Sequence, residues 1–175
     1  MIKITLLIIA VLIAGVLLFA ATKPDTFQVR RAATIKAPPE KVYPLINDFK
    51  QWAAWSPWDK KDAGMKRTFG AISAGKGATY AWDGNKDVGR GVMEIVEAVP
   101  PSKIRIKLDF EAPFEAHNIV TFTLEPRDGG TEVTWLMEGP ASYFTKIIHV
   151  FFSMDKMVGG DFEAGLAAMK AAAEK

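Results

Sequence analysis

The chain opens with a long apolar run. From Ile4 to Ala21 the only polar side chain is Thr5, so about 18 residues could span the roughly 30 Å hydrocarbon core of a bilayer as a helix. A cleaved signal peptide is the alternative, because Lys3 provides a small basic region and Ala20 and Ala21 are small. The run is longer than a usual signal core and no A-x-A site follows it. We therefore expect an uncleaved transmembrane anchor.

The anchor is predicted to cover residues 1–22, followed by a short linker of residues 23–26 and one domain of residues 27–175. Fully extended, the segment between anchor and first strand reaches no more than about 17 Å, so the domain must lie against the lipid headgroups. Basic residues flank the apolar run on both sides: Lys3 before it, and Lys23, Arg30 and Arg31 after it. These flanks do not fix the orientation, since a long following domain can be translocated regardless of its charge; we expect the N-terminus inside the cytoplasm and the domain on the extracytoplasmic, periplasmic side.

Short alternating segments dominate the middle of the chain and predict β-strands. The first is Phe27 to Ile35, in which Arg31 falls on the apolar parity. Two interpretations of Arg31 are open. Either its aliphatic stem packs on the sheet while its guanidinium reaches water, or the guanidinium faces an acidic group of a ligand in a cavity. The later strands are expected at residues 66–69, 77–82, 89–99, 104–110, 120–124 and 133–137, with turn residues between them. Because the connections are short, we expect antiparallel neighbours.

Two short helices are expected after the first strand. Ala37-Pro38-Pro39-Glu40 ends the strand and opens a helix, and a second helix runs from Gln51 to Trp55 and ends at Ser56-Pro57. Three tryptophans follow at a spacing of three: Trp52, Trp55 and Trp58. Such a cluster either packs the short helices onto the sheet or forms an aromatic wall at the mouth of a pocket.

The C-terminal run from Tyr143 to Glu174 predicts the one long helix of the domain. Its stripe of apolar residues recurs at helical spacing and must be covered by another surface: Val158, Phe162, Leu166 and Met169. Three glycines let another backbone or a ligand approach closely: Gly159, Gly160 and Gly165. The part from Ser142 to Met154 has a wider apolar arc but is too short to span a membrane. It is a buried helix, an interfacial helix dipping into the bilayer, or a gate over a cavity.

Composition narrows the function classes. The formal charge is +2 with no basic run, which argues against nucleic-acid binding, and the absence of cysteine excludes disulfides and thiolate chemistry. No H-E-x-x-H, G-x-S-x-G or P-loop motif occurs, so no cofactor or metal is expected. His117 and His149 are expected to face solvent, and Asp109, Glu111 and Glu115 to form a solvated rim. No nucleophile lies beside a base, so a catalytic role is not visible.

The order of elements, with A-P-P-E-K-V-Y-P-L-I-N-D at residues 37–48 and W-S-P-W at residues 55–58, resembles the START-like superfamily, also called SRPBCC or polyketide cyclase/dehydrase-like. The resemblance covers roughly residues 27–175. It implies an α+β helix-grip fold, in which a curved antiparallel sheet wraps the last helix and leaves a hydrophobic tunnel. Its members include carriers, receptors and enzymes, so the fold alone does not choose the function.

These patterns lead to a main hypothesis and two alternatives. The main one is a membrane-anchored domain that binds a lipid or other hydrophobic small molecule between sheet and helix, with Arg31 or Asn118 contacting a polar head. The full set of candidate cavity residues is Arg31, Tyr80, Trp82, Met93, Ile106, Asn118, Phe122, Trp135, Phe162 and Leu166. The alternatives are an accessory subunit of a larger membrane protein complex and, by family analogy alone, a cyclase-like or dehydratase-like enzyme.

Overall fold

The computed structural model describes residues 2–175, so the first residue of the predicted anchor lies outside the described part. The helices are α1 (Ile2–Ala21), α2 (Pro39–Asn47), the 3₁₀ helix η1 (Phe49–Ala54), α3 (Pro57–Lys61), α4 (Tyr143–Phe151) and α5 (Met154–Ala173). The strands are β1 (Thr26–Ile35), β2 (Lys66–Phe69), β3 (Thr79–Asp83), β4 (Arg90–Val99), β5 (Lys103–Ala112), β6 (Ala116–Arg127) and β7 (Gly130–Pro140).

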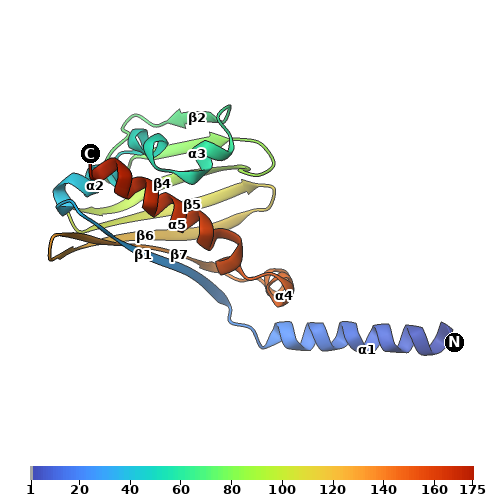
Figure 1. The fold of residues 1–175 in the computed structure, drawn as a ribbon. Helices are drawn as coiled ribbons and strands as arrows, with labels where there is room; N and C mark the ends of the chain where they lie inside the picture. Colours follow the sequence, from blue (N-terminus) through green and yellow to red (C-terminus); the bar gives the residue numbers. More distant parts are fainter. Residues whose placement is uncertain (1) are drawn as a thin grey trace.

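The strands form one curved antiparallel sheet in the order β1-β7-β6-β5-β4-β3-β2. Each strand from β2 to β7 pairs with its neighbour in sequence, and β1 closes the other edge by pairing with β7. Figure 1 shows α5 crossing the concave face of this sheet, with α2 and α3 beside it. The predicted α+β helix-grip architecture is confirmed.

The core lies between the inner face of the sheet and α5. Alternate residues of the strands point inward and are buried, as the two-residue period requires. From α5, Phe162, Leu166 and Met169 are buried against them. Gly165 allows close approach, because a Cβ there would lie 2.8 Å from Cζ3 of Trp135 and 3.2 Å from Cδ of Pro57. The apolar stripe of the helix is therefore covered by the sheet, as its spacing predicts.

The short helices after β1 are tied to one another through tryptophan nitrogens. Nε1 of Trp52 donates to the Ile46 carbonyl at 2.9 Å, and Nε1 of Trp55 donates to the Leu45 carbonyl at 2.7 Å. The second short helix ends at Ala54 and Ser56 is extended (φ −62°, ψ 126°), close to the end that the sequence predicts. A further short helix, α3, then begins at Pro57, because proline fits its first turn. This extra turn places Trp58 over Trp135, with ring centroids 5.9 Å apart.

The C-terminal run is two helices, not one continuous helix. Phe152 adopts an extended conformation (φ −132°, ψ 120°) after α4, and the Ser153 hydroxyl then accepts a hydrogen bond from the Lys156 amide at 3.2 Å to cap α5. The break lets α4 leave the line of α5, and Figure 1 shows it beyond the edge of the sheet.

Helix α1 extends away from the domain (Figure 1) and its apolar side chains are almost all exposed. Within residues 2–175 it is the one helix long and apolar enough to cross a membrane, and a signal sequence would meet the same criterion. Only Ala20, next to its C-terminal end, is buried.

Candidate functional site

The structure brings the predicted apolar cavity residues together: six lie on the inner face of the sheet, which we call the wall, and two lie on α5, which covers it. Tyr80, Trp82, Met93, Ile106, Phe122 and Trp135 lie on the inner face of β3 to β7, and Phe162 and Leu166 face them from α5. All eight are at most 7% exposed and belong to one core cluster. Their placement follows from strand parity and the helical stripe.

Aromatic rings fill the space between this wall and α5. The Trp135 and Phe162 rings are stacked with centroids 4.1 Å apart, and Phe122 lies 4.9 Å from Trp135. Trp55 contacts Trp135 edge-on at 5.4 Å. Two surface depressions lie near the ends of the strands, one of about 400 Å³ lined by residues 36–39, 126 and 129–130, the other of about 150 Å³ between β2, β3, β4 and the end of β5, where Trp82 contributes to its lining. The tunnel that the resemblance implies is thus occupied by the chain's own side chains here.

Some apolar side chains that pack against this interior are only partly buried. Trp58 lies beside Trp135 and Phe162, and Phe110 packs edge-on against Trp82 at 5.5 Å. The start of α5 contributes Met154 and Val158, also partly buried. An apolar molecule would meet these side chains before it reached the fully buried rings.

Tyr80 is the one ionisable group among the buried wall residues. Burial, and secondarily the nearby Asp59 carboxylate, raises the pKa of Tyr80 to about 12. The hydroxyl is therefore neutral and remains a hydrogen-bond donor at physiological pH.

Asn118 lies on the inner face of β6 and is 5% exposed. Its cross-strand neighbours are Leu108 and Gly139, and its Oδ1 occupies the space that a Cβ at residue 139 would need. A second polar group in this interior is Nε1 of Trp135, which is buried with no hydrogen-bond partner among the described residues. The Asn118 amide and the Trp135 indole N–H are thus polar groups of this interior, together with the Tyr80 hydroxyl.

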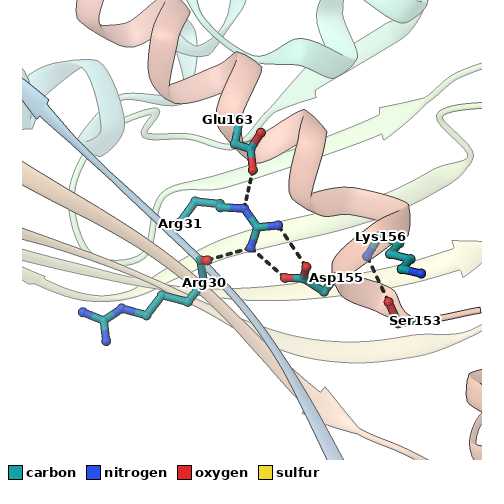
Figure 2. Close-up of polar contacts among 6 residues, drawn as sticks. All are labelled: Arg30, Arg31, Ser153, Asp155, Lys156 and Glu163. Atoms are coloured by element: carbon teal, nitrogen blue, oxygen red, sulfur yellow. Dashed lines mark hydrogen bonds and ion pairs between the residues drawn. The ribbon is translucent and has the colours of Figure 1, made fainter.

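Arg31 is the cross-strand partner of Trp135, but acidic side chains of α5 engage its guanidinium. Figure 2 shows Nε donating to Glu163 at 2.6 Å, while Nη1 and Nη2 donate to the two oxygens of Asp155 at 2.6 and 3.0 Å. Nη1 also donates to the Arg30 carbonyl at 2.8 Å. Gly159 is needed here, since a Cβ would overlap Nη2. The carboxylates that meet Arg31 belong to the protein, and they hold the start of α5 on β1.

Sequence reasoning missed this role of Asp155, Gly159 and Glu163. Their signal was a spacing of four, which places all three on one face of α5, beside the apolar stripe. A glycine between two acidic residues at this spacing predicts a binding site for the side chain of an arginine or lysine, but it does not identify which residue binds there.

We expect the Asp155→Asn variant to be less stable than the natural chain at pH 7, and the difference to be lost at a low pH that lies below the lowered folded-state pKa of Asp155. Hydrogen bonds from Arg31 lower the pKa of Asp155 below its ordinary value, so the ionised form stabilises the fold above that value and is lost as pH falls through the folded-state pKa. Urea unfolding at both pH values measures this. Asp128→Asn, at the exposed β6–β7 turn, is the control and should change little. A difference that persists at low pH would contradict the role of ionisation.

The other polar cluster lies on the outer face of the sheet. Nδ1 of His117 lies 2.7 Å from Asp109, which also pairs with Lys107 at 2.8 Å. Hydrogen bonding to Asp109 raises the pKa of the exposed His117 ring. His149, by contrast, is partly buried edge-on against Phe27 at 5.9 Å, and burial lowers its pKa. The prediction that His149 faces solvent was wrong, because α4 folds back over the start of β1.

A curved antiparallel sheet that grips a C-terminal helix through apolar side chains defines the helix-grip class of domain. The chain belongs to the family described as "Polyketide cyclase / dehydrase and lipid transport", whose model matches residues 26–174. The fold of this family suggests the binding of a hydrophobic ligand. A search among curated proteins found no match.

Solved structures of the same fold include protein CV1439 from Chromobacterium violaceum, with 22% identity, a TM-score of 0.60, and coverage of 87% of this chain and 99% of that chain. The Aha1 dimer from Colwellia psychrerythraea has 15% identity and a TM-score of 0.61, covering 85% of this chain and 96% of that chain. Protein Ms6760 from Mycobacterium smegmatis has 20% identity and a TM-score of 0.57, covering 86% and 92%. At these identities the likeness shows the fold alone.

Proposed function

We propose that the chain is a membrane-anchored binding domain for a lipid or another hydrophobic small molecule. The observation that carries the proposal is the family match over residues 26–174, directly preceded by an apolar helix of membrane-spanning length. Only residues 22–25 separate α1 from β1. A domain on such a short connection stays beside the bilayer, where an apolar ligand can be exchanged without crossing much water.

The ligand would lie between the inner face of the sheet and α5. Most wall positions there are apolar or aromatic, and the unpaired Nε1 of Trp135 and the amide of Asn118 can meet a polar head. Because the Trp135 and Phe162 rings are stacked, binding requires them to separate. Trp58 and Phe110 are only partly buried, and we expect the ligand to enter beside one of them.

Native mass spectrometry of the full chain, extracted in a mild detergent, tests the proposal. We expect a hydrophobic molecule to co-purify, and Leu108→Trp, on the inner face beside Asn118, to reduce the bound fraction. Lys107→Trp is the matched control, because it adds the same ring on the exposed outer face of the same strand. Circular dichroism checks that both variants fold. An empty natural chain, or equal binding by both variants, would overturn the proposal.

A further inference from the structure

Exposed apolar side chains gather on α4 and on the turn that leads into α5. Among the described residues that follow α1, eight large apolar side chains are exposed, and five of these belong to residues 143–157. We call these five the apolar patch: Tyr143, Phe144, Phe151, Phe152 and Met157. The other three lie singly in loops or at a strand end, at Ile72, Val99 and Phe114. Since isolated apolar residues are ordinary on a surface and clusters are not, the patch calls for a partner.

The polar side of α4 faces the domain, which is the reverse of an ordinary surface helix. Lys146 is 8% exposed and its Nζ pairs with Asp25, just before β1. His149 packs against Phe27, and the Ser142 hydroxyl caps the helix by accepting from the Thr145 amide at 3.2 Å. These contacts fix the helix with its aromatic residues exposed, on the side away from the start of β1.

Helix α4 packs against the C-terminal part of α1. The Tyr143 hydroxyl donates to the Leu17 carbonyl at 2.9 Å, and Figure 1 shows α4 beside this end of α1. Leu17 precedes the last residue of α1, Ala21, by four residues, or about 6 Å along the helix axis. Just beyond, Nζ of Lys23 lies 4.6 Å from the Phe19 ring centroid, a cation–π contact at this end of α1.

We propose that the apolar patch inserts into the headgroup and upper acyl region of the bilayer beside α1. This inference rests on the proposed function in one respect, that α1 spans the membrane. A helix of 20 residues is about 30 Å long, which matches the hydrocarbon core, so its last turn lies at the boundary. The hydrogen bond to Leu17 places α4 at the same depth, within the roughly 5–10 Å that interfacial helices penetrate. Tyrosine and phenylalanine suit this depth.

The natural chain has no cysteine, so a single introduced cysteine can carry a fluorescent label at a known position. The experiment uses the full chain in vesicles of phosphatidylcholine and phosphatidylglycerol, with an environment-sensitive label at Phe144→Cys or Phe151→Cys. Asp128→Cys is the aqueous control, because the β6–β7 turn is separated from α4 by the length of β7, about 36 Å. Ile9→Cys, in the middle of α1, reports on the anchor itself.

We expect the Phe144 and Phe151 labels to shift to bluer emission than the Asp128 label, to be quenched most by lipids with a doxyl group near the headgroup, and to resist aqueous iodide. The Ile9 label should be quenched most by a doxyl group near the chain end. Patch labels that iodide reaches as readily as the control, with Ile9 deep, would overturn the insertion of α4 and leave the anchor standing. Patch labels shielded from both lipid and iodide would also overturn it, and would indicate a protein partner. An Ile9 label open to iodide would overturn the anchor and the insertion together.

Discussion

Replacing Phe162 with alanine is expected to lower the free energy of unfolding by about 3–5 kcal/mol. Phe162 is 1% exposed, stacks on Trp135 with centroids 4.1 Å apart and meets the Trp58 ring at 6.3 Å. If Trp135 moved into the space left behind, it would lose packing against Trp55 and Phe122 on its other sides. Chemical denaturation of the full chain in detergent, followed by tryptophan fluorescence, measures the loss.

The control for this variant is Met157→Ala on the same helix. Met157 is 58% exposed, so in detergent its removal should change stability by no more than about 0.5 kcal/mol. A loss from Phe162→Ala as small as that of the control would mean that α5 is not held by the sheet. The stacked interior described above would then be wrong.

The features that depend on local periodicity could be predicted from the sequence. The alternation of Ile104, Ile106 and Leu108 places their side chains on the buried face of β5, as expected. The four-residue repeat of Phe162 and Leu166 likewise identifies the buried stripe of α5. Both patterns are set by the geometry of one element, so they need no knowledge of its neighbours.

Contacts between distant segments could not be predicted in this way. Arg31 lies 124 residues from Asp155 and 132 from Glu163, and the sequence indicated only that this arginine was out of place on an apolar parity. Whether the interior is hollow or filled depends on how Trp135 and Phe162 meet, which is decided by the distance between sheet and helix. The break at Phe152 was missed because the apolar pattern continues through it on both sides.

A substitution in the W-S-P-W segment is the second from which we expect a large loss of stability, because this segment links the short helices to the centre of the core. Trp55 is 0% exposed, and its ring lies 4.7 Å from Trp52 and 6.0 Å from Phe122. We expect Trp55→Ala to cost about 3–5 kcal/mol, measured by denaturation as above.

Trp55→Phe separates ring packing from hydrogen bonding. The phenylalanine keeps most of the aromatic contacts but leaves the Leu45 carbonyl without the donor that now lies 2.7 Å away, which should cost about 1–3 kcal/mol. Trp58→Phe, three residues on and only partly buried, is the matched control and should cost less. If the two phenylalanine variants were equally stable, the bond from Trp55 to α2 would contribute nothing, and packing alone would hold the short helices on the sheet.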